Sequence, residues 1–199
     1  MDEVQLIQAA QGGDLDAFNR LVLTYQNLAF NVAWRLLGDD AAEDATQDAF
    51  IAAYRSIHRF RGGSFKAWLL RIVTNGCYDE LRRRQRRPQT PLEPDPADEN
   101  QADPSWLADP GEGPQELAER AELNTAIQRC LSQLEPEFRA AVILVDVQGL
   151  DYGEAAHALK RPLGTVKSRL ARARARLQNC LQGFAELLPD RFRLNMQEP

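Results

Sequence analysis

The side chains best suited to recognition chemistry lie between residues 165 and 177, where cations alternate with small residues. At helical spacing Ser168, Ala171 and Arg172 share one face, and an apolar row that begins at Val166 occupies the other. Arginine can donate two hydrogen bonds to guanine, serine can bond several bases, and alanine can contact a thymine methyl group. This pattern favours a helix that lies against base edges in the major groove of DNA.

The residues before this segment predict a helix-turn-helix. Asp151 and Glu154 form a D-x-x-E start, in which both side chains satisfy free amides at a helix N-terminus. Pro162 cannot continue that helix, Gly164 permits a tight turn, and Thr165 is expected to cap the next helix. An ordinary solvated helix face would explain the arginines alone, but it would not explain the capped helix and the proline turn in front of them.

Catalytic chemistry has little support in the sequence. The acidic residues Asp40, Glu43, Asp44 and Asp48 could in principle gather around Mg²⁺, which would suit a nuclease or a recombinase. They fall on one expected helix without a phosphate-binding glycine loop, and no nucleophile–base pair accompanies them. We therefore expect neither an enzyme nor a cofactor.

The cysteines Cys77, Cys130 and Cys180 are far apart in the chain, and no C-x-x-C pair is present. A zinc site is not expected, because only two histidines accompany them. We expect these cysteines to be buried as small hydrophobic side chains.

The net charge of −5 conceals a strong division along the chain. Residues 61–87 carry eight Lys or Arg against two acids, whereas residues 88–119 carry nine acids and no Lys or Arg. Because a polyanion is attracted by the local sign of the charge, an acidic protein can still bind DNA through its basic segments. No apolar run has transmembrane length and no signal peptide is recognised, which predicts a cytoplasmic protein without direct membrane insertion.

Helical periodicity at both ends of the chain predicts an all-α fold of two small helical domains. Asp14 is expected to cap a long helix that Gly38 closes, with further helices from about 40 to 57 and from 64 to 87. The acidic, proline-rich segment between the domains predicts a flexible linker, because it cannot bury enough apolar surface to order itself. The predicted division is an N-terminal domain over 1–87, the linker over 88–114, a C-terminal helix-turn-helix domain over 115–185 and a tail over 186–199.

Three motifs, taken in order, resemble the extracytoplasmic-function (ECF) group of bacterial RNA polymerase sigma factors. The first is D-A-T-Q-D-A-F at 44–50, and the second is F-K-A-W-L-L-R-I-V-T-N at 65–75, followed by D-E-L-R-R at 79–83. The third joins L-E-P-E-F-R at 134–139 to G-T-V-K-S-R at 164–169. Their order around an acidic linker carries the resemblance.

The resemblance implies that the acidic helix docks on the clamp helices of the largest subunit of core RNA polymerase. An acidic and amide surface suits a basic partner, although an ordinary solvated face would carry the same charge. The residues expected at this contact are Asp40, Glu43, Asp44, Gln47, Asp48 and Phe50.

The second motif is similar to the part of the family that opens the minus-ten element of promoters. Aromatic side chains mixed with cations suit unstacked bases, and in the family the loop over 59–64 helps to hold a flipped base. Trp68 is expected in the core, and the C-terminus of a helix by itself favours part of the arginine cluster over 82–87. The expected minus-ten residues are Arg59, Phe60, Arg61, Ser64, Phe65, Arg71, Asn75, Arg82 and Arg83.

The third motif implies recognition of the minus-35 element. Some relatives carry an aromatic residue where Ala171 stands, so the sequence preference at minus-35 stays open. The expected residues are Thr165, Lys167, Ser168, Arg169, Ala171, Arg172 and Arg176.

Two functions remain in view. The resemblance implies a dissociable specificity subunit that gives core polymerase promoter recognition and strand opening, under the control of an anti-sigma factor. The alternative is a free-standing helix-turn-helix regulator, which explains the C-terminal block but leaves the acidic helix and the aromatic loop without a role. Co-purification with core polymerase would separate the two.

Overall fold

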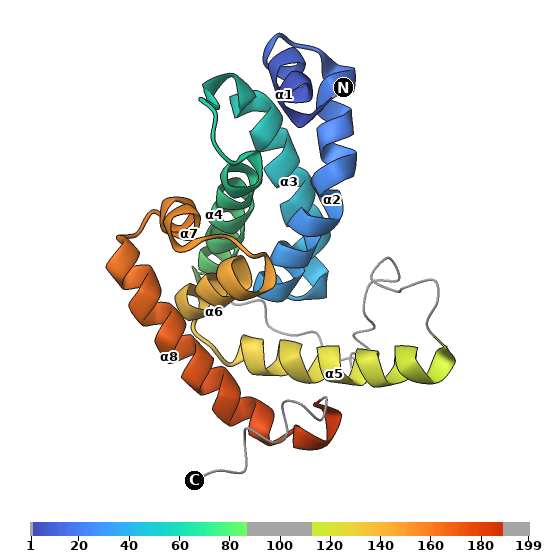
Figure 1. The fold of residues 1–199 in the computed structure, drawn as a ribbon, viewed down its shortest axis with the longest axis vertical. Helices are drawn as coiled ribbons and strands as arrows, with labels where there is room; N and C mark the ends of the chain where they lie inside the picture. The colour runs from blue at the N-terminus through green and yellow to red at the C-terminus, as the bar shows by residue number, and fades with distance from the viewer. Residues whose placement is uncertain (1, 87–112, 189–199) are drawn as a thin grey trace.

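The chain folds into two blocks of helices, which the computed structural model describes over residues 2–86 and 113–188 (Figure 1). The N-terminal block consists of α1 (Glu3–Gln11), α2 (Leu15–Leu37), α3 (Asp39–Ser56), the 3-10 turn η1 (Ile57–Arg59) and α4 (Phe65–Arg86). The C-terminal block consists of α5 (Pro114–Ser132), α6 (Pro136–Val142), the π-helical turn η4 (Ile143–Val147), α7 (Tyr152–Leu159), α8 (Leu163–Gln182) and the 3-10 turn η5 (Ala185–Leu187). No strand occurs in the two described ranges, so the all-α prediction is confirmed. The predicted linker, except its last two residues, and most of the predicted tail lie outside those ranges.

Local capping signals begin and end the helices as predicted at three sites. Asp14 accepts a hydrogen bond from the Ala17 amide at 3.0 Å, and Gly38 ends α2 with a φ of 83°. At the start of α7 the Asp151 carboxylate accepts from the Glu154 amide at 2.7 Å, and the Glu154 carboxylate accepts from the Asp151 amide at 3.0 Å. These reciprocal bonds satisfy amides that have no partner inside the helix.

The turn between α7 and α8 is tighter than predicted. Lys160 takes the left-handed conformation with a φ of 50°, whereas Gly164 does not adopt a positive φ. Pro162 takes the N-cap position, and its carbonyl oxygen accepts from the Thr165 amide at 2.9 Å. Thr165 therefore lies in the first turn of α8 and does not cap it, because a proline in extended conformation can start the helix at the next residue.

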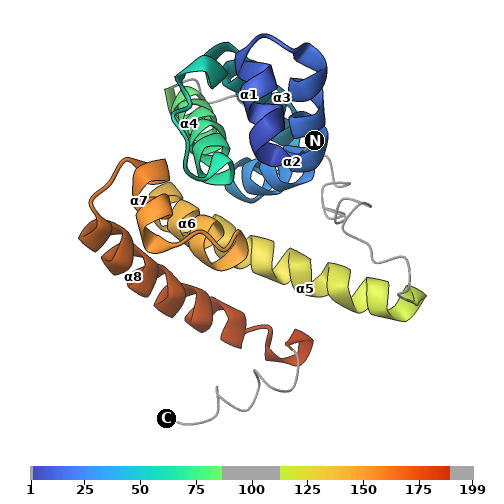
Figure 2. The ribbon, with the colours of Figure 1, turned by 45° about the horizontal axis from the view of Figure 1, so that its top comes forward.

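One hydrophobic core runs through both blocks. Leu21, Trp34 and Leu36 of α2 are buried at its centre, and Ile143 and Leu144 of η4 belong to the same cluster. Figure 2 shows the four N-terminal α-helices above a layer made of α5 to α8. Each fully buried Leu or Ile contributes about 1.5–3 kcal/mol relative to an exposed one, so this packing holds the blocks together.

Long polar side chains reinforce the contact between the blocks. Gln128 of α5 donates to the Trp34 carbonyl oxygen at 3.2 Å, and Arg139 of α6 donates to the Leu36 carbonyl oxygen at 2.8 Å. Carbonyl groups in the last turn of a helix lack their usual partners in that helix. The Gly38 amide also donates to the Trp34 carbonyl oxygen at 2.8 Å, and Arg139 supplies a donor to the Leu36 carbonyl oxygen. Burial lowers the pKa of Arg139 from its ordinary value.

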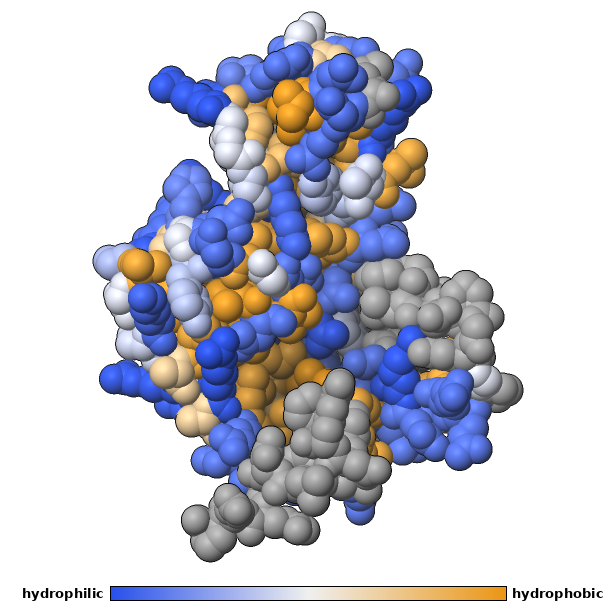
Figure 3. Space-filling model, in the orientation of Figure 1, coloured by the Kyte–Doolittle hydropathy of each residue, from blue (hydrophilic) through white to orange (hydrophobic). Residues whose placement is uncertain are grey.

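A second, smaller cluster packs α8 against α5 and α6. Leu131, Leu134 and Leu170 are buried in it, and on the face seen in Figure 3 apolar surface gathers where these helices meet. Beside this cluster a disulfide joins Cys130 of α5 to Cys180 of α8, with their Cα atoms 5.7 Å apart.

The disulfide corrects the prediction that the cysteines serve as buried small hydrophobic side chains. That prediction holds for Cys77, which is free and buried, and burial raises the pKa of its thiol to about 12. It is wrong for Cys130 and Cys180, which are 50 residues apart in sequence and meet because α5 packs against α8.

Candidate nucleic-acid interface

The outward face of α8 carries the small and basic residues that the periodicity placed there. The inward face is buried, with Val166 at 0% exposure and Leu170 at 2%. Lys167 lies over the Tyr152 ring, with its Nζ 5.6 Å from the ring centroid. The exposed positions of α8 include Lys167, Ser168, Ala171, Arg172, Ala175 and Asn179.

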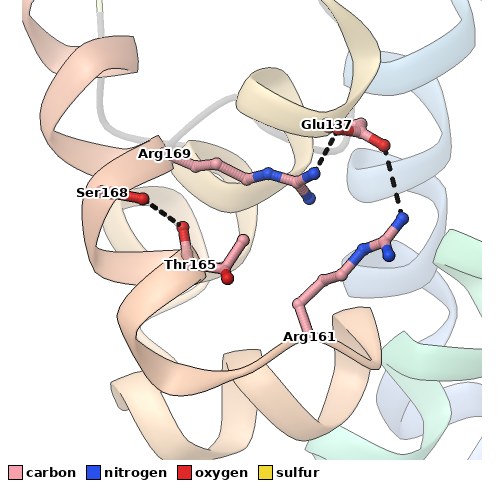
Figure 4. A network of polar contacts seen from close by, with 5 residues as sticks. All are labelled: Glu137, Arg161, Thr165, Ser168 and Arg169. Carbon is pink, nitrogen blue, oxygen red and sulfur yellow. Dashed lines mark hydrogen bonds and ion pairs between the residues drawn. The ribbon is translucent and has the colours of Figure 1, made fainter.

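Arg169 forms an ion pair within the protein, and its side chain is only 18% exposed. Its guanidinium pairs with the Glu137 carboxylate of α6, and Arg161 in the turn reaches the other oxygen of that carboxylate at 3.5 Å (Figure 4). Glu137 thus links three elements of the helix-turn-helix block, and the Arg169 guanidinium faces Glu137 in this structure. Sequence reasoning assigned no role to Glu137, because the 32 positions that separate it from Arg169 leave no local pattern.

Two further cations of α8 also have acidic partners. Arg174 pairs with Asp146 of η4 through Nε at 3.0 Å and Nη2 at 2.5 Å, and Arg176 pairs with Glu135. Arg172, by contrast, has no side-chain partner within residues 2–86 and 113–188. Since an unpaired guanidinium loses no protein contact on binding, Arg172 is the arginine of α8 best placed to reach a base.

A hollow of about 680 Å³ lies between the loop that precedes α4, α4 itself and α7. It brings together most of the predicted minus-ten residues, and α7 contributes residues that the sequence did not indicate. Its lining includes Arg59, Phe60, Arg61, Ser64, Trp68, Arg71 and Asn75, together with Gly153, Glu154 and His157 of α7. Cations, rings and an amide therefore face one open hollow.

Aromatic rings form the floor of this hollow. Phe65 is 2% exposed, and its ring centroid lies 5.6 Å from that of Phe60 and 5.3 Å from that of Trp68. The buried Phe65 ring therefore supports the lining of the hollow from beneath. Trp68 is half-buried, so it belongs both to the core, as expected, and to the lining.

The arginines at the end of α4 pair with acids one turn earlier. Arg82 pairs with Asp79, and Glu80 receives Arg83 at 2.7 Å and Arg84 at 3.1 Å. Burial acts to raise the pKa of Glu80, but the hydrogen bonds from Arg84 and Arg83 outweigh it and lower the pKa. The Arg82–Asp79 pair is exposed on both sides, and pairs of this kind contribute about 0–1 kcal/mol, so Arg82 can exchange this partner for a phosphate at little cost.

The acidic face of α3 borders a second hollow of about 760 Å³ between α3 and α4. Asp44, Gln47 and Asp48 line it from α3, and Glu43 is exposed on the same helix. Phe50 is half-buried and packs against the core. Asp40 belongs to α3, but its side chain lies outside the described residues. Of the predicted polymerase-binding side chains, Glu43, Asp44, Gln47 and Asp48 are therefore exposed, and Phe50 is half-buried.

Two general properties bear on the function. Within the described ranges, no group of three His, Cys, Asp or Glu side chains comes together as a metal site requires. None of the helices described is both long enough and apolar enough to cross a membrane.

Comparison with known proteins assigns the two blocks to one family. The Sigma-70 region 2 model matches residues 21–87, and the Sigma-70 region 4 model matches residues 124–177. The chain is 34% identical to the ECF RNA polymerase sigma-E factor of Escherichia coli over 178 residues, which cover 89% of this chain and 93% of that protein. The chain belongs to the ECF sigma factors. As a member, it is a subunit that directs RNA polymerase to promoters.

Other relatives agree with this assignment. The sigma factor is 36% identical to the RNA polymerase sigma-H factor of Pseudomonas aeruginosa over 181 residues, or 89% of this chain and 93% of that protein. It is 38% identical to SigE of Mycolicibacterium smegmatis over 168 residues, which cover 84% of this chain but 62% of that relative. The free-standing regulator is thereby disfavoured, because region 2 accounts for the N-terminal block.

Solved structures share the fold. The sigma factor RpoE of Bartonella quintana, in complex with the anti-sigma factor NepR, superposes with a TM-score of 0.65 at 28% identity, over 84% of this chain and 98% of that chain. CnrH, in complex with the cytosolic domain of CnrY, superposes with a TM-score of 0.60 at 27% identity, over 92% of this chain and 97% of that chain.

Proposed function

We propose that this sigma factor opens promoter DNA by receiving an unpaired base of the minus-ten element in the hollow beside α4. The observation that carries the proposal is the convergence of Phe60, Trp68, Arg71 and Asn75 on one space of about 680 Å³. Stacking of a base on an aromatic ring is worth about 1–3 kcal/mol, which offsets much of the cost of extruding it. The Asn75 amide can bond the base edge, and no covalent step is required.

The same protein binds core polymerase through α3 in this proposal. The exposed Asp44, Gln47 and Asp48 present carboxylate and amide groups to a basic helical surface, for which the clamp helices of the largest subunit are the expected partner. Arg82 and Arg83, at the far end of α4, contact the phosphates next to the minus-ten element. The proposed function has no chemistry of its own, since the polymerase makes the RNA.

Recognition of the minus-35 element falls to α8. Arg172 reaches a base edge, Ser168 and Ala171 permit close approach, and Lys167 holds a phosphate. Arg176 pairs with Glu135 in an exposed position, so it can exchange that partner for a phosphate.

Access to the minus-ten hollow requires a rearrangement. Gly153, Glu154 and His157 of α7 form one wall of the hollow, and the Glu154 carboxylate would repel a nucleic-acid backbone there. We infer that region 4 moves away from region 2 when the sigma factor binds polymerase and promoter. The two DNA-reading surfaces can then engage separate elements of one duplex.

An anti-sigma factor is the proposed regulator. RpoE of Bartonella quintana, a structural relative that matches 84% of this chain, was solved in complex with the anti-sigma factor NepR. Because its partner is RNA polymerase, we place the action of the protein in the cytoplasm.

Transcription in vitro tests the function. Core polymerase with this protein should start RNA synthesis from a randomised promoter library, and the selected templates report both promoter elements. Asn75→Ala should impair open-complex formation and spare polymerase binding, while Asn27→Ala, at an exposed position of α2, should behave as the wild type. Failure to start RNA at any template would reject the proposal, and metal-dependent DNA cleavage by the purified protein would revive a nuclease.

A further inference from the structure

Gln11, the last residue of α1, reaches the start of the loop that lines the minus-ten hollow. Its Nε2 donates one hydrogen bond to the Phe60 carbonyl oxygen at 2.7 Å and another to the Ile57 carbonyl oxygen at 3.1 Å. These acceptors are 49 and 46 residues away in sequence. A single side-chain amide thus joins α1 to the first residue of η1 and to Phe60, the first residue of the loop.

The loop depends on anchors at its two ends. Gly62 and Gly63 adopt φ values of 90° and 87°, a conformation that residues with a side chain rarely adopt. Two adjacent glycines give the backbone great freedom, so the ends of the loop set its shape. At the C-terminal end Ser64 accepts from the Ala67 amide at 3.1 Å, which ties the loop to α4. At the N-terminal end, Gln11 connects the loop to another helix, α1.

Helix α1 is itself held firmly enough to serve as a support. Ile7 and Ala10 are buried in the main core, and Asp2 and Gln5 cap the start of the helix reciprocally. Gln11 is half-buried, so its amide is directed into the protein and not toward a ligand in solvent.

Phe60, whose carbonyl oxygen Gln11 binds, lines the hollow. The Phe60 ring centroid lies 5.5 Å from that of Trp68. If the Phe60 backbone moves, the distance from its ring to Trp68 and to Asn75 changes with it. The shape of the hollow therefore depends on a side chain that does not line it.

We propose that Gln11 is a positioning residue for promoter opening, which fixes the 57–60 backbone so that Phe60 forms the wall against which an unpaired base packs. This inference rests on the function proposed above for the hollow. It concerns a residue outside the region 2 match, which begins at residue 21.

The test uses the full chain with core polymerase. Gln11→Met keeps the length of the side chain and removes both donors, and Gln8→Met makes the same change at an exposed position of the same helix. The rate of open-complex formation is measured on the selected promoter and on promoters with an abasic site at each minus-ten position of the non-template strand. All measurements are made well below the melting temperature of each variant, with polymerase affinity measured in parallel.

We expect Gln11→Met to open the intact promoter about tenfold more slowly, as the loss of one or two hydrogen bonds predicts. On the promoter that lacks the captured base, the variant and the wild type should open at the same rate, because there is no base left to position. Gln8→Met should match the wild type on every template, and polymerase affinity should not change.

Two results would overturn the inference, and they differ from each other. If Gln11→Met slows opening by the same factor on the intact promoter and on every abasic promoter, the residue supports the fold in general and does not act through the hollow. If the wild type itself opens every abasic promoter as fast as the intact one, the hollow takes no base, and the proposed function of the hollow fails as well.

Discussion

Nη1 of Arg71 in α4 lies 3.4 Å from Nε2 of His157 in α7, across the hollow proposed to receive a base. Because a guanidinium only donates hydrogen bonds, the imidazole must accept through an unprotonated Nε2. The two residues are 86 positions apart and belong to region 2 and region 4. Their contact therefore adds a polar link between region 4 and region 2 at the hollow.

His157→Arg should weaken this closed packing, because it brings a second cation against Arg71. The free protein should expand, with a larger radius of gyration in small-angle scattering, and bind a single-stranded minus-ten oligonucleotide at least severalfold more tightly. Asn27→Arg adds the same charge at an exposed position of α2 and serves as the control. An unchanged radius would show that this contact does not hold the blocks together.

Arg172→Ala should reduce discrimination at one minus-35 base pair by about 1–3 kcal/mol, because its guanidinium is free to form two bonds to a base. Binding to minus-35 duplexes with every single substitution measures the effect. Arg176→Ala is the comparison, since a phosphate contact should weaken all the duplexes alike. Uniform weakening by Arg172→Ala would make that residue a phosphate contact too.

Glu137 and Arg169 should be coupled in stability by about 0.2–1 kcal/mol, since the pair joins α6 to α8 but remains partly exposed. Urea unfolding of Glu137→Gln, Arg169→Gln and the double variant forms a double-mutant cycle that measures the coupling. The same cycle with Arg172→Gln should show none. Equal coupling for both arginines would contradict the separate roles assigned to them.

Reduction of the disulfide between Cys130 and Cys180 should lower the free energy of unfolding by about 2–4 kcal/mol, because the cross-link closes a loop of about 50 residues. Urea unfolding with and without dithiothreitol measures the loss. Cys180→Ala should unfold at the same urea concentration in both conditions. A thiol reagent should detect one thiol, that of Cys77, in unreduced unfolded protein.

Alkaline pH should destabilise the fold through Cys77. Burial raises the pKa of its thiol from 9.0 to about 12, so the unfolded chain releases this proton at lower pH than the folded chain. The stabilisation is complete below pH 9 and is lost as the pH rises from 9 toward 12. Cys77→Ala should flatten the decline in urea midpoint over this range, and Tyr78, whose pKa burial raises from 10.0 to about 12, accounts for part of the remainder. An identical decline in the variant would exclude Cys77 as a source.

The sequence alone was sufficient for features that depend on near neighbours. Asp14, Gly38 and the Asp151–Glu154 pair set helix ends, because a cap is made by residues within one turn of each other. Helical periodicity separated the buried Val166 and Leu170 from the exposed Ala171 and Arg172, and the order of three motifs indicated the family. The sequence thus predicted most of the residues that line the hollow beside α4 and the outward face of α8.

Tertiary structure alone decided which of those residues are free to act. It tied Arg169 to Glu137, buried Phe65, joined Cys130 to Cys180 and set α7 against the minus-ten hollow. Each of these results depends on helices that are distant in sequence and meet through packing of apolar faces, and such packing has no local signature. Whether a cation faces solvent or a carboxylate depends on the helix that packs next to it in space. The residues adjacent to it in sequence do not reveal which helix that is.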